Sequence, residues 1–399
     1  MSLNQKVGSQ TAAVLAWELT DQHAWGIVGM QLYLNWALHG RFQPVMLYPI
    51  DTQAIRSFDL LRRKSLEQAI EVSNPVSAQL TQKLLVEKNE NVSINIPVIH
   101  ALGIEFGSMT KELRGSSNIG RMVFEFTALK QAKVNEGRYD CYVVASEWNA
   151  QILRASTRTP VYVNHEGVDT SIFHPAPKSG LFDTDHFLIY TSGKIEYRKG
   201  QDLVLEAFRI FSQNKSNVKL VTAWQSVFSQ FSKGFQGILE RPITYDANNS
   251  ANVKKWAVDN GIDSEKVIDL GLVPHHSIPY VMREMDCALQ LSRAEGGTNL
   301  VAMELMACGI PTIISDTTGH KDIVHLPNAI PVNTTGQVRI ASDKGSEGWG
   351  EASIEDVVEQ LERLYELKRS GKNFRSHELF YRNWKDHAQD LEKILERHL

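Results

Sequence analysis

The sequence predicts two doubly wound α/β domains with parallel sheets, followed by a helical tail. Short apolar or β-branched runs alternate with stretches of helical periodicity along the 399-residue chain. The runs are continuously apolar, which is typical of parallel strands that helices cover on both faces. The alternation stops once, in residues 163–185, which are rich in Pro, Gly and Asp. This interruption indicates a domain boundary.

The expected elements follow in order. In the first half we expect strands at 12–19, 44–50, 94–102, 121–126 and 141–146, with helices at 29–40 and 56–70. In the second half we expect strands at 187–193, 219–224, 266–272, 287–292 and 311–315. The helices between and after them are expected at 201–213, 252–261, 277–285, 299–309, 353–370 and 384–399.

Composition excludes several classes of protein. The chain is 42% apolar and 22% charged, and its formal net charge is -4. This balance is ordinary for a globular protein and offers no basic field for a nucleic-acid partner. Cys141, Cys287 and Cys308 lie in apolar segments without metal-ligand spacing. We expect them to be buried free thiols in a reducing compartment.

The ends of the chain and its apolar runs bear on localisation. The first ten residues are polar and lack the apolar core of a signal peptide. No run approaches the roughly 18 apolar residues that a membrane-spanning helix needs. We therefore expect a cytoplasmic protein. The basic stretch 61–64 favours a solvated helix face, and peripheral contact with an anionic membrane or a lipid-linked acceptor is the alternative.

The stretch RAEGGTNLVAMELMACGIPTI, residues 293–313, has the composition of a phosphate-binding loop and helix. Gly296 and Gly297 allow close approach of the backbone to a ligand, and Thr298 or Asn299 caps the next helix. The helix N-terminus offers unpaired N–H groups to an anion. Glu304 lies five residues further, about 8 Å at ~1.5 Å per residue, which is the reach from a diphosphate to a ribose.

Glu295 precedes the two glycines and would accept hydrogen bonds from a sugar. A second loop, in residues 190–208, places Lys194, Arg198 and Lys199 between a strand and an amphipathic helix. Such cations can clamp a diphosphate and stabilise it as a leaving group. Taken singly, each loop is better explained by a solvated turn, and the second loop is not a P-loop.

The two stretches in order, 193–208 and 269–315, resemble the C-terminal half of a family 4 glycosyltransferase with the GT-B fold. The resemblance is strong over residues 187–325 and weaker at 141–153 and 163–175. It implies two Rossmann-like domains facing a cleft. Residues 1–170 would bind the acceptor, residues 171–380 would bind the nucleotide sugar, and a last helix at 381–399 would pack back on the first domain.

The resemblance also implies roles for individual residues. Lys194 and Lys199 would bind the donor diphosphate, Glu304 the ribose and Glu295 the donor sugar. The other residues implied to contact the donor are Gly296, Gly297, Thr298, Asn299, Val273, Gly26 and Gly29. The last two would belong to a glycine loop near the acceptor and the phosphate.

The sequence departs from the family pattern at three positions. The family separates its two glutamates by seven residues, whereas eight lie between Glu295 and Glu304, so either Glu295 or Gly296 holds the first position. Lys194 replaces a common arginine and loses its bidentate fork. The family's strand-end histidine is absent. Glu125 stands near its place as a candidate for acceptor contact, and His100 is the nearest alternative.

The resemblance implies sugar transfer from a nucleotide-diphosphate sugar, with retention of configuration and without a metal ion or other cofactor. The acceptor would be a glycan, a lipid-linked molecule or a small molecule. Asp183 and Asp185 form a DxD-like pair, which we interpret as a solvated turn. Two alternatives remain open: a nucleotide-sugar-binding module without transfer, and a nucleotide-sugar epimerase of the same fold.

Overall fold

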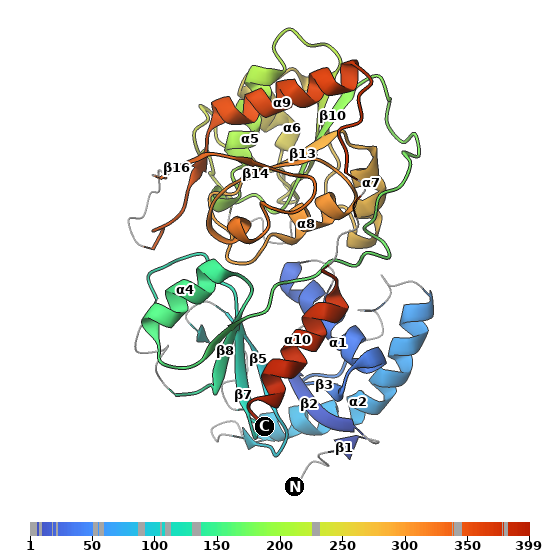
Figure 1. Cartoon of the computed structure of the whole chain (residues 1–399), viewed down its shortest axis with the longest axis vertical. Helices are drawn as coiled ribbons and strands as arrows, with labels where there is room; N and C mark the ends of the chain where they lie inside the picture. Colours follow the sequence, from blue (N-terminus) through green and yellow to red (C-terminus); the bar gives the residue numbers. More distant parts are fainter. Residues whose placement is uncertain are drawn as a thin grey trace. The chain divides into compact units, whose positions relative to one another are not determined.

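The computed structural model separates into two compact units (Figure 1). The N-terminal unit comprises Met1–Gly167 and Arg382–Leu399, and the C-terminal unit comprises Val168–Tyr381. The division falls close to the boundary expected at residue 170. The structure describes residues 6–7, 10–17, 19–20, 23–50, 55, 60–86, 92–103, 106–107, 113–129, 137–225, 232–336, 338, 345–376, 378 and 382–399.

The N-terminal unit contains a largely parallel sheet. Its strands are β1 (Lys6–Val7), β2 (Gln10–Ala16), β3 (Phe42–Met46), β5 (Val98–Leu102), β7 (Asn118–Met122), β8 (Cys141–Val144) and β9 (Val161–Val163). Apart from the short antiparallel β1, the order is β3-β2-β5-β7-β8-β9. The order therefore reverses between β2 and β5. A small parallel pair, β4 (Val92–Ser93) with β6 (Leu113–Arg114), lies outside this sheet.

The described helices of this unit are α1 (Ala24–His39), α2 (Leu60–Val86), α4 (Glu147–Ser156) and α10 (Trp384–Glu396). The last helix of the chain, α10, packs against α1, as Figure 1 shows. The Trp36 indole on α1 donates to the Ala388 carbonyl oxygen on α10 at 3.1 Å. A capping box at Asn383 and Asp386 begins α10. Among the described residues, none belongs to a helix long and apolar enough to cross a bilayer.

Several expected boundaries in this unit are wrong, and three of them bear on the argument. The strand expected at 121–126 is β7, which begins at Asn118 and ends at Met122. The described part of α2 continues to Val86, through Pro75, well beyond the expected end. The helix α1 begins at Ala24, because the His23 side chain caps it by accepting the Gly26 N–H. Gly26 and Gly29 therefore lie inside a helix, whereas the sequence predicted a loop.

The C-terminal unit has an entirely parallel six-stranded sheet. Its strands are β10 (Phe187–Ser192), β11 (Val218–Ala223), β12 (Val267–Asp269), β13 (Cys287–Gln290), β14 (Thr312–Ser315) and β15 (Ala329–Val332). They lie in the order β12-β11-β10-β13-β14-β15, which is the doubly wound order with a reversal between β10 and β13. A short antiparallel pair, β16 (Thr334–Thr335) and β17 (Glu351–Ala352), is separate from it.

Helices cover both faces of this sheet. They are α5 (Gln201–Phe211), α6 (Val253–Asp259), α7 (Ile278–Glu284), α8 (Leu300–Ala307) and α9 (Ile354–Arg369). Side chains of β10 alternate between two cores: Phe187 and Ile189 pack with residues of α5, α6 and α9. Leu188 and Tyr190 pack with residues of α7 and α8. Burial on both faces explains why the strands read as continuously apolar runs.

All three cysteines are free and buried, as the sequence predicted. Burial raises the pKa of the Cys141 thiol, and likewise that of Cys308, to about 12. These thiols are therefore protonated at neutral pH and are poor nucleophiles.

Candidate functional site

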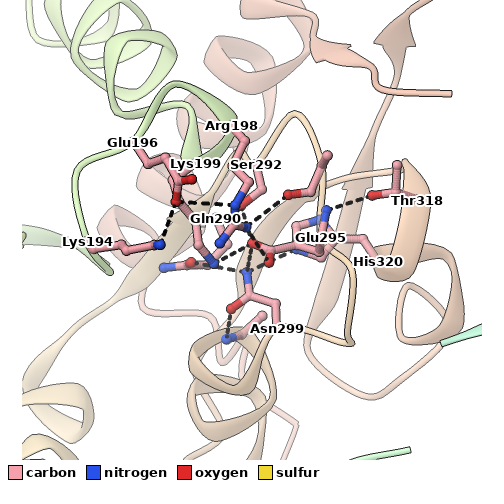
Figure 2. Close-up of polar contacts among 12 residues, drawn as sticks. Lys194, Glu196, Arg198, Lys199, Gln290, Ser292, Glu295, Asn299, Thr318 and His320 are labelled. Atoms are coloured by element: carbon pink, nitrogen blue, oxygen red, sulfur yellow. Dashed lines mark hydrogen bonds and ion pairs between the residues drawn. The ribbon is translucent and has the colours of Figure 1, made fainter. Parts of the chain in front are cut away.

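Two loops meet at the point where the strand order of the C-terminal sheet reverses. β10 and β13 are parallel neighbours, with Ile189 opposite Cys287, so their carboxyl ends lie at one edge of the sheet. Residues 193–200 follow β10, and residues 291–299 follow β13. Open α/β sheets bind ligands at such a reversal point. The fold therefore brings the two sequence motifs together, and Figure 2 shows their side chains in contact.

Two glycines shape the first loop. Gly193 has φ +121°, and no described atom lies within 4 Å of the position its Cβ would take. The backbone beside Lys194 thus faces open space. Gly200 has φ +69°, and a Cβ there would lie 2.1 Å from the Leu291 carbonyl oxygen. Because only glycine fits, Gly200 lets the start of α5 touch the loop that leaves β13.

Glu295 lies at the centre of the contacts drawn in Figure 2. Its carboxylate accepts hydrogen bonds from Lys199 Nζ at 2.6 Å and from Arg198 Nη1 at 3.0 Å. The Ser292 hydroxyl donates a third at 2.5 Å, and Asn299 Nδ2 a fourth at 3.2 Å. Glu295 is only 4% exposed. In this structure its oxygens are occupied by the protein, so Glu295 holds the two cations in place.

Neighbouring charges keep Glu295 ionised in spite of its burial. Burial alone would raise the pKa of the Glu295 carboxyl, but the charges of Lys199 and Arg198 outweigh this effect and hold the pKa well below its usual range. Burial lowers the pKa of Lys199, and the charge of Glu295 opposes that shift. The carboxylate and the lysine are therefore mutually stabilised as a charged pair.

Lys194 approaches the same cluster through a second carboxylate. Its Nζ lies 3.0 Å from Glu196 Oε2, which is also 3.2 Å from Arg198 Nε. Burial would raise the pKa of Glu196, but the charges of Arg198 and Lys194 hold it below its ordinary value. This cluster thus sets three cations, Lys194, Arg198 and Lys199, against two carboxylates, Glu196 and Glu295, which leaves one net positive charge.

A buried histidine anchors the second loop, and the sequence did not predict it. His320 is fully buried, and Asn299 Nδ2 lies 3.0 Å from its Nε2. Its Nδ1 lies 3.0 Å from the Ser315 carbonyl oxygen, which indicates a neutral ring with the proton on Nδ1. Burial lowers the pKa of His320 to about 4. The Asn299 side chain is thereby oriented to accept the Ala302 N–H and begin α8.

Glu304 lies within the C-terminal unit and points toward the end of β12. It is buried on α8, and its Oε1 lies 2.6 Å from His275 Nε2. His275 begins a 3-10 turn two residues after Val273, and its ring packs on Phe173. The sequence did not identify His275. The backbone around Val273 follows β12 and includes Gly271 at φ +68°.

The three small residues between the glutamate and the cap are enclosed. Gly296, Gly297 and Thr298 are buried, and the Thr298 hydroxyl contacts the Met303 sulfur at 2.9 Å. The Gly319 N–H donates to the Glu295 carbonyl oxygen at 2.9 Å. A residue after β14 therefore fixes the backbone of this loop.

Arg293 forms contacts with both loops. From the sequence it was considered only as the first residue of the stretch 293–313. Its guanidinium makes two hydrogen bonds to the Asp202 carboxylate, at 2.8 and 2.7 Å, and a third to Glu351 at 2.7 Å. It also donates to the Tyr197 carbonyl oxygen at 2.7 Å and lies 4.1 Å from the Tyr197 ring centroid. Burial would lower the pKa of Arg293, but its bonds to Asp202 raise it.

Four of the sequence candidates belong to the N-terminal unit. A Cβ on Gly26 would lie 2.3 Å from the Thr20 carbonyl oxygen, and one on Gly29 would lie 2.8 Å from the Trp17 ring. Tight packing of α1 on Thr20 and Trp17 therefore favours glycine at both positions. Glu125 is half-buried, three residues after β7 ends. His100 lies in the middle of β5, where burial lowers its pKa to about 4, and bonds Asn118 at 3.1 Å.

The DxD-like pair forms a turn. The Asp183 carboxylate accepts the Asp185 N–H at 3.0 Å and pairs with the His186 ring at 3.0 Å. These contacts belong to an exposed segment that precedes β10. It therefore lies at the opposite end of this strand from the loop at 193–200.

We expect Gly319→Ala to disrupt the second loop. Its new Cβ would lie 1.9 Å from the Gly297 carbonyl oxygen and 2.7 Å from that of Glu295, so the loop must move. We expect a loss of about 1–3 kcal/mol in unfolding free energy, the usual cost of overpacking, measured by urea denaturation. Gly336→Ala is the matched control, because no described atom lies within 4 Å of its Cβ position. Equal stability of the two variants would contradict the expectation.

Comparisons with known proteins agree with this geometry. Residues 174–327 match the family model described as glycosyl transferases group 1. The match contains both loops and the strands β10 and β13 that carry them. The C-terminal unit carries a glycosyltransferase domain. A search of the curated proteins gave no match.

Solved structures are similar over nearly the whole chain. Sucrose-phosphate synthase from Thermosynechococcus elongatus superposes with a TM-score of 0.63 at 14% identity, covering 97% of this chain and 98% of that one. HepE from Anabaena, in complex with UDP and glucose, gives 0.54 at 12% identity, covering 97% and 95%. The apo structure of OtsA gives 0.54 at 12%, covering 97% and 96%. The glycosyltransferase domain therefore belongs to a chain with the GT-B fold.

Proposed function

We propose that the chain transfers a sugar from a nucleoside-diphosphate sugar to an acceptor hydroxyl, with retention of configuration and without a metal ion. The observation that carries the proposal is the cation cluster of Lys194, Arg198 and Lys199 at the reversal point of the C-terminal sheet. The cluster lies inside the matched glycosyltransferase domain. UDP-sugars are the first candidates, because the HepE complexes hold UDP.

The chemistry follows from charge placement. Negative charge develops on the diphosphate as the bond from the sugar to its oxygen breaks. The positive charges of Lys194 and Lys199 would stabilise that negative charge. The N-terminus of α8, which has no acidic residue in its first turn, would add its partial positive charge. In this proposal the fixed cations stabilise the leaving diphosphate, as a divalent ion does in metal-dependent transferases. We assign the ribose to Glu304, with His275 as its positioning partner.

We assign the acceptor to the N-terminal unit, with Glu125 as a contact residue. The acceptor would be a glycan, a lipid-linked molecule or a small molecule. A lipid-linked acceptor would require a membrane surface, and Leu60 and Leu61 at the start of α2 are 58% and 79% exposed beside Arg62 and Arg63. Sedimentation with anionic vesicles tests this contact. A wild-type protein that stays in the supernatant would exclude it.

Product analysis tests the function as a whole. The purified chain is incubated with a UDP-, GDP- or ADP-sugar, with and without candidate acceptors, and the products are assigned by NMR. We expect transfer with the anomeric configuration of the donor, undiminished by EDTA. An isomerised donor would indicate an epimerase. Tight nucleotide binding without turnover would indicate a binding module, a role favoured by the complete engagement of Glu295 with protein groups.

We expect Glu196→Gln to bind nucleoside diphosphate more tightly. The Glu196 carboxylate pairs with Lys194 and Arg198, the cations that a diphosphate would use, so it competes with the ligand. Removing one partly exposed charge should strengthen binding about fivefold, or ~1 kcal/mol, measured by calorimetry with UDP. The control is Glu206→Gln, which removes a carboxylate paired with Arg209 on α5. Weaker binding by Glu196→Gln would show that the carboxylate positions the cations instead.

A further inference from the structure

Arg121 is a fully buried cation whose hydrogen-bonding groups are unused. It lies on β7, and its side chain is 0% exposed. Within the part of the chain that the structure describes, Nε, Nη1 and Nη2 of Arg121 have no hydrogen-bond partner. Arg121 forms an ion pair with Glu166, whose Oε1 lies 3.7 Å from Nη2, beyond hydrogen-bond distance. Buried donors without partners are costly, so this group requires an explanation beyond packing.

The surroundings of Arg121 combine aromatic faces with a second unused polar atom. The guanidinium carbon lies 5.3 Å from the Trp17 ring centroid and 5.5 Å from that of Trp25. The two rings lie 5.2 Å apart, and Trp25 is half-buried. His387 Nδ1 donates to the His165 carbonyl oxygen, which leaves its buried Nε2 as an acceptor without a partner, suited to a hydroxyl group rather than to an anion. Burial, aided by the charge of Arg121, holds the pKa of His387 well below its ordinary value, so the ring is neutral.

These residues lie where an open α/β sheet binds ligands. The strand order of the N-terminal sheet reverses between β2 and β5, and β7 is the next strand after β5. Trp17 immediately follows the carboxyl end of β2, and Arg121 is next to last in β7. Trp25 belongs to the first turn of α1, which contains no acidic residue. The partial positive charge of this helix N-terminus therefore adds to that of Arg121.

We propose that Arg121 anchors an anion-binding site in the N-terminal unit, which receives the phosphate or carboxylate group of the acceptor. Assigning the anion to the acceptor rests on the proposed function, whereas the site itself does not. A guanidinium presents parallel N–H groups that match the oxygens of both anions. Beside the anion, the half-buried Trp25 ring offers an apolar surface on which the remainder of the acceptor can pack. The Glu166 carboxylate forms an ion pair with Nη2 at 3.7 Å, which is longer than a hydrogen bond, so it offsets part of the positive charge and leaves these donors available.

Inorganic phosphate is the first probe, and acetate is the second. Binding is followed by tryptophan fluorescence and thermal shift at constant ionic strength, in a Lys199→Met background that disables the proposed diphosphate site. We expect saturable phosphate binding in this parent. Adding Arg121→Lys keeps the charge but loses the fork and should weaken binding about tenfold or more. Adding Arg121→Met should abolish it. Trp25→Phe should retain binding and reduce the fluorescence change. If acetate binds more tightly than phosphate, the anionic group of the acceptor is a carboxylate.

Two results would overturn the site. One is a parent that binds neither anion, and the other is unchanged affinity in Arg121→Lys. If Arg121→Met fails to fold, the Arg121→Lys result decides alone. Failure of the proposed function has a different signature, because a chain that binds no nucleoside diphosphate can still bind phosphate at Arg121. With an active enzyme, phosphate should raise KM for the acceptor without changing kcat, and this effect should be lost in Arg121→Lys.

Discussion

Lys199→Met is expected to lower kcat/KM for sugar transfer by about 10²- to 10³-fold, the usual effect of removing one group that stabilises charge in a transition state. The Lys199 side chain is only 16% exposed and points its Nζ at Glu295. It would be one of two lysines that face the departing diphosphate. Methionine preserves much of the apolar stem, so the variant removes charge more than packing. Steady-state kinetics with the best donor measure the effect.

Folding and specificity need a separate control for this variant. Glu295 keeps its contacts with Arg198 and Ser292, so circular dichroism should show an intact fold. Lys255→Met makes the same substitution on α6, where the lysine pairs with Asp259 and its side chain is 58% exposed. We expect that control to retain full activity. Comparable activity in Lys199→Met and Lys255→Met would remove Lys199 from the mechanism.

Arg293→Met is expected to give the largest loss of stability, about 3–5 kcal/mol, because it leaves a buried carboxylate without its partner. Arg293 and Asp202 both have fully buried side chains, joined by two hydrogen bonds. The same substitution frees the Tyr197 carbonyl oxygen and the Glu351 carboxylate. Urea denaturation measures the stability. Nucleotide binding should weaken as well, because Arg293 joins the two loops of the site.

A double variant separates charge from packing. In Arg293→Met/Asp202→Leu the stranded carboxylate is gone, and replacing a buried ion pair by apolar groups is often close to neutral. We therefore expect the double variant to recover a large part of the stability lost in the single variant. Its nucleotide affinity should stay low, since the link between the loops is still broken. A cost below about 1 kcal/mol for Arg293→Met would contradict the assigned role.

The sequence predicted the architecture because the pattern of a doubly wound fold is local. Apolar runs, helical periodicity and glycines mark each strand, helix and turn without reference to distant residues. Lys199 and Glu295 could be selected in the same way, since each stands in a short stretch next to a strand end. Their direct contact follows only from the strand order, which places β10 beside β13.

The remaining site residues depend on partners far along the chain. Arg293 meets Asp202 across 91 residues, and His275 meets Glu304 across 29. No local spacing signals either pair, although an arginine two residues before a motif glutamate is a useful sign. Gly26 was predicted to lie in a loop, and it lies in α1, for a related reason. A glycine that allows tight helix packing and one that approaches a phosphate look the same in sequence.

The most direct test of the central claim is a crystal structure with a bound nucleoside diphosphate. We predict that the diphosphate oxygens lie within hydrogen-bond distance of Lys194 and Lys199, in the open space beside Gly193, and that the Lys194–Glu196 contact is broken or lengthened. A diphosphate bound away from the loops after β10 and β13, with both lysines still paired to their carboxylates, would contradict the account.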